Sequence, residues 1–419
     1  MPSASSTAPD GSTVEATLEP GPVSPTSARA SRPGGRRSQV VRIMRLLALA
    51  AVAALVLAFP ELAPNAYVLS AGVIILSYAV LATSWNFVGG FTGYISLGHA
   101  AYFGLGAYGT GLLITEAGIP SFVAVSLSAL IVLLIAVPIG IASLRVRGAS
   151  FVIVSIAFVL ILQLIFQAWG SFTGGSLGLT VPRPFPDLLR PEHHRAFFYL
   201  FAALLTIVVL LWWLIDRSRF GTRLKAIRED EDKAQSLGVP TRNYKLVAFV
   251  ISATSAAVTG GMYALWFGDL DPIFQFSILL GAYVVLMALL GGVRNVFGPV
   301  LGAVVVGVAL EYFKVNFGDT QFHLVAVALL LGIVVLFMPD GVIPAAAALA
   351  RRFGPQAVSI RELSAAELAQ RERGARADAA ARAEAAATAR RADLGDQAAA
   401  GDRDRSAEDL PTTRDQEER

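Results

Sequence analysis

Long runs of apolar residues, separated by short polar connections, fill the chain between about residue 40 and residue 344. Most of the runs reach the roughly 20 residues that an α-helix needs to cross the hydrocarbon core of a bilayer. We count ten, at about 44–59, 67–88, 96–115, 121–143, 150–169, 196–215, 245–268, 273–292, 297–313 and 322–338. The pattern predicts an all-α, polytopic integral membrane protein with about ten transmembrane helices.

The runs at 96–115 and 297–313 are the weakest of the ten. Glycines interrupt the first run, and the second is short and carries Glu311. Either run could re-enter the membrane from one side instead of crossing it. Removing both from the count leaves eight spans.

Basic residues gather on alternate sides of the predicted spans. With a cytoplasmic N-terminus and ten crossings, the inner connections hold Arg145, Arg147 and a dense basic cluster between residues 217 and 245. Two of the outer connections, 60–66 and 269–272, have no Lys or Arg. This bias has the sign of the positive-inside rule. We therefore expect both termini in the cytoplasm, and ten or eight spans in preference to nine.

The composition agrees with a lipid environment and separates two tails from the apolar region. Hydrophobic residues make up 55% of the chain and charged residues only 16%. Residues 1–38 are rich in Ser, Pro, Gly and Ala, which predicts a disordered N-terminal tail. Residues 39–344 then form the transmembrane domain, with its first span an uncleaved anchor. Residues 345–419, rich in Ala, Arg and Glu, form a charged cytoplasmic C-terminal tail.

Several kinds of chemistry are missing from the sequence. The chain has no cysteine, which excludes disulfides, thiol nucleophiles and Cys-ligated metals. No G-x-x-x-x-G-K-[ST] or H-E-x-x-H motif occurs, and the spans carry no ladder of charged residues. We expect no catalytic residues, no metal and no cofactor. A transporter of this composition would take its energy from another protein.

The segment 85–111 is unusually rich in glycine for a membrane helix. Small residues allow helices in lipid to approach closely, and the pair Gly298 and Gly302 has the same small-xxx-small spacing on a later run. We expect these glycines to serve helix packing. The predicted packing positions are Gly93, Gly98, Gly104, Gly106, Gly298 and Gly302.

Polar residues within or beside the apolar runs are the candidates for a solute path. Asn86, Ser96 and His99 belong to the glycine-rich segment, and an unpaired polar group is costly in lipid. They should face protein or a water-filled path. For His99, a structural hydrogen bond, a path-lining role and a proton relay all stay open. Gln163 and Gln167 are weaker candidates on another run.

The connection 216–244 is the longest polar insertion in the membrane region. Residues from about 222 to 237 have helix-forming composition, and Gly238 is a plausible stop signal. The acidic residues after Arg228 disfavour an anionic lipid surface, so we expect this amphipathic helix to dock on another protein. A solvated connector is the alternative. Ala226, Ile227, Ala234 and Leu237 supply a narrow apolar face at roughly helical spacing. The predicted coupling positions are Ala226, Ile227, Glu229, Ala234, Leu237 and Gly238.

Three stretches together resemble the permeases of high-affinity branched-chain amino acid ABC importers, specifically the M-type subunit. They read GYISLGHAAYFGLGAY at 93–108, FGTRLKAIREDEDKAQSLGV at 220–239 and LLGGVRNVFGPVLGA at 289–303. The ending FMPDGVIP at 337–344 is also similar, whereas the tails lie outside the resemblance. The acidic residues at 230–232 stand where the family's coupling segment usually has alanines.

The resemblance implies an ABC importer permease fold and a set of partners. These are a second, H-type permease, two cytoplasmic ATP-binding subunits, an extracytoplasmic solute-binding protein and the lipid bilayer, without nucleic acid. It implies a bacterial plasma membrane and transport of leucine, isoleucine and valine by alternating access. Urea, short amides or another small solute are the alternative cargo, and a self-sufficient secondary transporter is the rival class.

Overall fold

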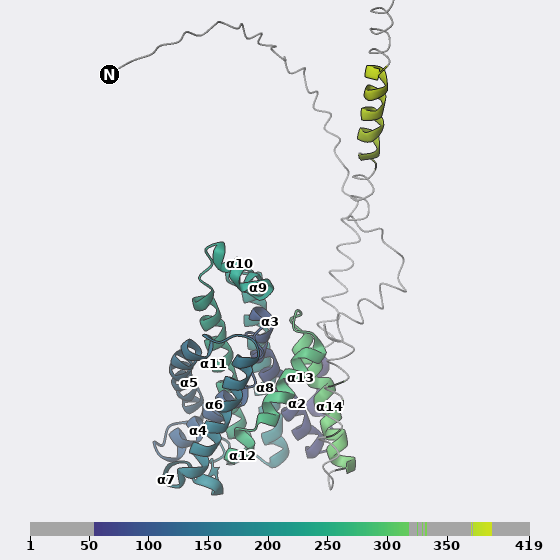
Figure 1. Ribbon diagram of the computed structural model, residues 1–419. Helices are drawn as coiled ribbons and strands as arrows, with labels where there is room; N and C mark the ends of the chain where they lie inside the picture. Colours follow the sequence, from purple (N-terminus) through teal and green to yellow (C-terminus); the bar gives the residue numbers. More distant parts are fainter. Residues whose placement is uncertain are drawn as a thin grey trace, which may run out of the picture.

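The computed structural model describes residues 54–317 and 372–387, together with the single positions 325, 329, 332 and 370. Nearly all of the described chain is helical, which confirms the predicted all-α membrane fold (Figure 1). Residues 54–62 are helical, and the labelled elements follow them. They are α2 (Ala66–Trp85), α3 (Gly89–Thr92), α4 (His99–Thr115), α5 (Ser121–Ser143), α6 (Ala149–Ala168), α7 (Gly170–Thr173), η1 (Gly175–Leu177), β1 (Leu179–Thr180), α8 (Arg190–Arg217), α9 (Arg219–Glu229), α10 (Glu231–Ser236), α11 (Thr241–Phe267), β2 (Asp269–Leu270), α12 (Pro272–Gln275), α13 (Ile278–Gly291) and α14 (Gly298–Phe317).

Seven helical segments in the described residues are long and apolar enough to cross a membrane. They comprise α2 with α3, α5, α6, α8, α11, α12 with α13, and α14. The weakly predicted run at 297–313 corresponds to α14, whose 20 residues favour a span over a re-entrant loop. Part of the first predicted run, almost all of the last and most of both tails lie outside the described residues. In the C-terminal tail, residues 372–387 form a helix with exposed side chains.

Helix α4 lies inside the bundle, between α11, α5 and α12. Eleven of its 17 residues are buried, and its glycines let the neighbouring backbones approach. Helix α6 is the opposite case, because its buried residues are only Phe151, Ser155 and Val159. Other apolar side chains of α6, such as Ile153, Ile161 and Leu164, are exposed on the surface of the described bundle.

The two ends of the bundle differ in structure. One end, which we name the loop end, carries α3, α9 and α10, and the other, which we name the sheet end, carries α7 and α12 (Figure 1). At the sheet end, β1 pairs with β2 in antiparallel register, with Leu179 opposite Leu270. The connection 170–195 is thereby fastened to the end of α11.

Candidate functional site

The chain between α2 and α4 turns back into the bundle at the loop end. Helix α2 ends at Trp85, α3 follows, and Gly93 reverses the direction with φ +76°, a conformation that glycine adopts without steric cost. The Trp85 indole Nε1 donates to the Ser96 carbonyl at 2.7 Å, and this bond holds the returning chain against the end of α2. The Leu97 amide donates to Ser155 Oγ at 3.1 Å. Ser155 lies six residues, or about 9 Å, from the start of α6. Helix α4 therefore begins beside this point of α6 instead of at the end of the bundle. We name residues 86–98 the re-entrant segment.

The structure brings His99 onto α11. His99 Nε2 lies 2.6 Å from Ser252 Oγ, and Ser252 Oγ donates to the Ser84 carbonyl at 2.5 Å. Because the serine hydrogen is already used, His99 must donate from Nε2 and keep Nδ1 as an acceptor. The Nδ1 atom has no partner in the described chain. His99 therefore ties together α2, α4 and α11 through one hydrogen-bond chain.

The other candidate path residues are dispersed. Asn86 is fully buried, and neither its amide nitrogen nor its amide oxygen has a partner among the described residues. Ser96 Oγ accepts from the Gly98 amide at 3.2 Å and lines a small cavity of about 20 Å³. Gln163 and Gln167 are partly buried on α6. Of the five, only Ser96 lines this cavity within the described part of the chain.

Four of the six predicted packing glycines lie where another backbone leaves no room for a side chain or where an aromatic ring fills the space. A Cβ at Gly106 would lie 2.1 Å from the Ala257 carbonyl oxygen of α11, and one at Gly104 would lie 2.4 Å from the Phe276 ring. The equivalent distances are 1.9 Å from Gly298 to the Gly292 oxygen and 1.8 Å from Gly302 to the Met287 oxygen. Gly93 instead forms the turn described above, and Gly98 is the N-cap of α4.

The predicted single amphipathic helix over 222–237 is wrong, because two helices occupy the loop. Helix α9 ends at Glu229, and Asp230 adopts an extended conformation with φ −161° and ψ 108°. Its carboxylate accepts from the Asp232 and Lys233 amides at 3.1 and 3.0 Å, which caps the new helix α10. These bonds, with that from the amide of Lys233 foremost, lower the pKa of Asp230.

The break at Asp230 also overturns the predicted apolar face. Ala226 and Leu237 were expected on the same face as Ile227 and Ala234, but a shared face requires one continuous helix. In the structure Ile227 and Ala234 are buried against the bundle, whereas Ala226 is exposed and Leu237 is 85% exposed. Glu229 and Gly238 are exposed as well, and Gly238 ends the loop with φ +82°.

Helix α9 is fastened to α3. Arg228 donates from Nη1 to the Gly90 carbonyl at 2.6 Å, and its side chain packs beside the Gly93 turn. A cleft of about 240 Å³ lies next to this contact and is lined by charged residues of both signs, among them Asp216, Lys225 and Arg294. Movement of α9 would therefore act directly on the start of the re-entrant segment.

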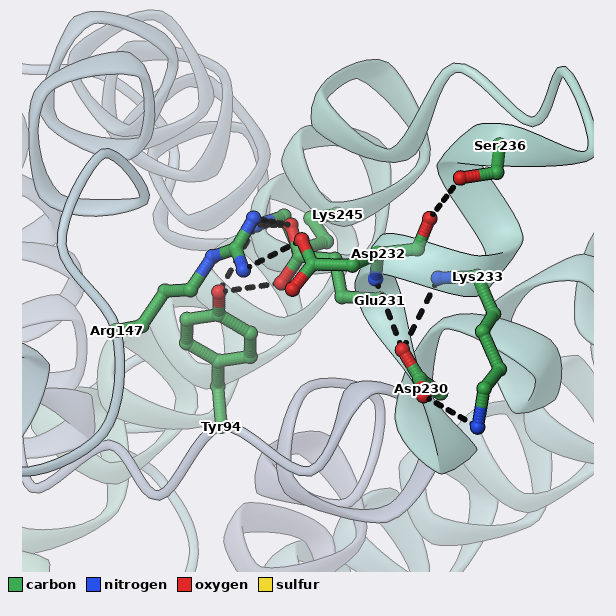
Figure 2. A network of polar contacts seen from close by, with 8 residues as sticks. All are labelled: Tyr94, Arg147, Asp230, Glu231, Asp232, Lys233, Ser236 and Lys245. Carbon is green, nitrogen blue, oxygen red and sulfur yellow. Dashed lines mark hydrogen bonds and ion pairs between the residues drawn. The ribbon is translucent and has the colours of Figure 1, made fainter.

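Helix α10 is fastened to three other parts of the loop end by a polar network (Figure 2). Glu231 pairs with Lys245 of α11 at 2.5 Å and accepts from the Tyr94 hydroxyl at 2.9 Å. Arg147, from the α5–α6 connection, pairs with Asp232 at 2.9 Å and with Glu231 at 3.4 Å. Burial, followed by the hydrogen bond to Glu231, raises the pKa of the Tyr94 hydroxyl. We name Tyr94, Arg147, Glu231, Asp232 and Lys245 the α10 network.

Sequence reasoning missed Tyr94 and Lys245 as members of this site. The side chain of Lys245 is only 4% exposed and that of Glu231 12%, so the pair is largely withdrawn from water. Lys245 at the start of the predicted apolar run 245–268 was the available signal, since a buried charge needs a partner. The acidic cluster at 229–232 was noticed, but its partners come from distant parts of the chain.

A second cavity, of about 200 Å³, lies between α2, α4, α11, α12 and α13. We name it the α12 cavity. Its polar lining residues include Ser77, Tyr78, Tyr263, Gln275 and Tyr283. None of the path residues predicted from the sequence lines it, because tyrosines and serines in apolar runs give no distinctive pattern.

Comparison with known proteins identifies the family that shares this sequence. A family described as "Branched-chain amino acid transport system / permease component" matches residues 67–339. LivM of Escherichia coli K12, named a high-affinity branched-chain amino acid transport system permease protein, is 27% identical over 329 residues, which are 72% of this chain and 76% of LivM. LivH of the same strain is 27% identical over 283 residues, 64% of this chain and 91% of LivH.

BraD of Pseudomonas aeruginosa, which has the same description, is 35% identical over 129 residues, 31% of this chain and 41% of BraD. No solved structure shows significant similarity to the chain. The matched region covers the whole helical bundle from α2 to α14 and agrees with the resemblance seen in the sequence. The chain therefore belongs to the family of permease components of branched-chain amino acid transport systems.

Proposed function

We propose that this permease is the M-type transmembrane subunit of an ATP-driven importer for leucine, isoleucine and valine in a bacterial plasma membrane. The relatives named above support the cargo. The expected partners are an H-type permease, two cytoplasmic ATP-binding subunits and an extracytoplasmic binding protein. Both termini would then lie in the cytoplasm, with the loop end inside and the sheet end outside.

The observation that carries the proposal is the double attachment of the loop 216–244. Arg228 of α9 donates a hydrogen bond to the carbonyl of Gly90. Glu231 of α10 accepts from the Tyr94 hydroxyl and pairs with Lys245. The two helices thus contact the re-entrant segment and α11, while other residues of the same loop, such as Leu237, stay exposed. One side of this short helix pair is buried against the bundle and the other side is exposed. The pair is therefore suited to transmit a movement of a partner protein to the bundle.

ATP binding and hydrolysis on the partner subunits would move α9 and α10 together. The motion would tilt α8 and α11, which flank the loop, and shift the re-entrant segment that leads to His99. Outward-open and inward-open states would alternate in this way. The chain carries no P-loop motif of its own, which fits an ATPase on separate subunits.

Two exposed leucines at opposite ends of the molecule provide the test. Leu237 at the loop end is 85% exposed and Leu177 at the sheet end is 99% exposed. An aspartate at either position should leave the fold intact, because neither side chain is packed. We expect Leu237→Asp to reduce co-purification of the ATP-binding subunits and ATP-dependent leucine uptake, and Leu177→Asp to leave co-purification unchanged.

Equal co-purification in both variants would contradict docking at the loop. Uptake that needs no ATPase and is abolished by an uncoupler would instead favour a secondary transporter. The cargo is checked separately by competition, in which isoleucine and valine should displace labelled leucine. Stronger competition by urea or a short amide would favour the alternative cargo.

A further inference from the structure

The α12 cavity combines a hydrophobic interior with polar groups that have no protein partner. Gln275 is 3% exposed and Tyr283 8%, so both are almost entirely enclosed by protein. Within the described part of the chain, the Gln275 amide and the Tyr283 hydroxyl make no hydrogen bond. Both groups open onto the cavity, where a bound molecule or water would supply the missing hydrogen bonds.

The shape of the surrounding helices adds a second polar feature. Helix α12 ends at Gln275 and α13 begins at Ile278, so the backbone is broken beside the cavity. Ser277 caps α13 by accepting from the Leu279 amide at 3.2 Å, and both residues line the cavity. The N-terminus of a 14-residue helix carries partial positive charge and favours a negatively charged group.

Apart from Ser77, the rest of the lining is apolar or aromatic, and no lining residue carries a formal charge. Leu81 and Phe103 contribute hydrocarbon surface, and Tyr78 and Tyr263 contribute ring faces with hydroxyl groups. The volume of the cavity is about 200 Å³. The cavity is therefore sized for a small solute rather than for a peptide or a lipid.

We propose that the α12 cavity is a solute-binding site for a zwitterionic amino acid with an aliphatic side chain. The α-carboxylate lies at the N-terminus of α13 and accepts from the Gln275 amide, and the α-ammonium lies against the tyrosine rings and hydroxyls. The aliphatic side chain contacts Leu81 and Phe103. An aspartate or lysine side chain would place a charge where the lining offers no partner. This assignment rests on the proposed function and specifies where this chain holds its cargo.

The absence of cysteine makes a direct labelling test available. Ser77 lines the cavity from α2, and Ser77→Cys changes the side chain by a single atom. The complete complex, carrying this variant and reconstituted in lipid, is treated with N-ethylmaleimide in the presence and absence of leucine. By mass action, leucine at ten times its dissociation constant should slow modification roughly tenfold. Ser277→Cys on the facing wall should be protected in the same way.

Ser236→Cys is the matched control, because this exposed serine on α10 lies at the loop end, away from the cavity. Leucine should leave its modification rate unchanged, and aspartate or lysine should protect none of the three cysteines. Equal rates at Ser77→Cys and Ser277→Cys with and without leucine would overturn the assignment. If the same complexes still perform ATP-dependent leucine uptake, that result removes only the cavity and leaves the proposed function standing.

A side-chain substitution gives an independent readout. Gln275→Leu keeps a similar volume and removes the amide, so we expect leucine uptake to fall roughly tenfold, the size of one lost hydrogen bond. Asn316→Leu, which removes an exposed amide at the end of α14, should retain full uptake. Unchanged uptake in Gln275→Leu would contradict the role of the amide. If the unaltered complex showed no leucine uptake, the proposed function itself would be contradicted.

Discussion

Single glycines determine how closely the central helices of this permease approach. Gly106 of α4 faces the carbonyl of Ala257, and Gly260 of α11 faces the carbonyl of Phe103, so each helix offers a glycine to the other's backbone. Hydrophobic burial does not drive helix association in lipid, and close backbone packing contributes much of the attraction instead. The glycine-rich sequence of α4 is thus a requirement of its position between α11, α5 and α12.

We predict that Gly106→Ala destabilises the permease by about 1–3 kcal/mol, the usual cost of overpacking a filled interior. The new Cβ would lie 2.1 Å from the Ala257 oxygen, so α4 and α11 would have to separate. Thermal unfolding in detergent measures the effect. Gly170→Ala is the control, since a Cβ there meets no atom within 4 Å and should change the melting temperature little. Equal melting temperatures would argue against this close α4–α11 contact.

Helices α9 and α10 show what can and cannot be read from the sequence of an element. The helix-forming composition of residues 222–237 and the stop at Gly238 correctly indicated a helical polar loop. The sequence did not reveal that Asp230 would cap a second helix, because an aspartate inside a helical pattern fits either a helix interior or a cap. The inner faces of both helices are set by nearby Lys245 and by partners more than 80 residues away, including Gly90 and Tyr94.

The ion pairs of the α10 network should differ in strength according to burial. We expect Lys245→Met to destabilise the permease by about 3 kcal/mol, the lower end for breaking a buried pair, because Glu231 would keep a largely enclosed charge. Arg147→Ala should cost less than about 1 kcal/mol, because its partner Asp232 is 79% exposed. Chemical or thermal unfolding of the assembled permease compares the two variants.

The double variant Lys245→Met with Glu231→Gln separates pairing from packing. Removing both charges eliminates the enclosed carboxylate, which in Lys245→Met keeps only the longer pair with Arg147 and the Tyr94 hydroxyl, so part of the lost stability should return. A Lys245→Met variant as stable as the unaltered protein would show that the pair does not fasten α10 to α11. A variant that is stable but has lost uptake would assign the pair to coupling instead of stability.

At the scale of the whole molecule, the apolar runs predicted the described architecture well. Seven of the predicted runs became helices long enough to span, and the run at 96–115 became the shorter, interior α4. The candidate site was harder to predict. The α12 cavity draws Ser77, Phe103, Tyr263 and Gln275 from elements scattered over 200 residues, and only the packed bundle brings them together. Asn86 and His99 were noticed as polar groups, but their surroundings depend on α11 and the re-entrant segment.

The proposed mechanism requires the loop end to lie in the cytoplasm. Ser236→Cys and Leu177→Cys place single cysteines at exposed positions on the loop end and the sheet end of a chain that has none. A membrane-impermeant maleimide should label Ser236→Cys in inverted vesicles and Leu177→Cys in intact cells. The reverse pattern would place α9 and α10 outside the cell, beyond the reach of any cytoplasmic ATPase, and would contradict the proposed mechanism.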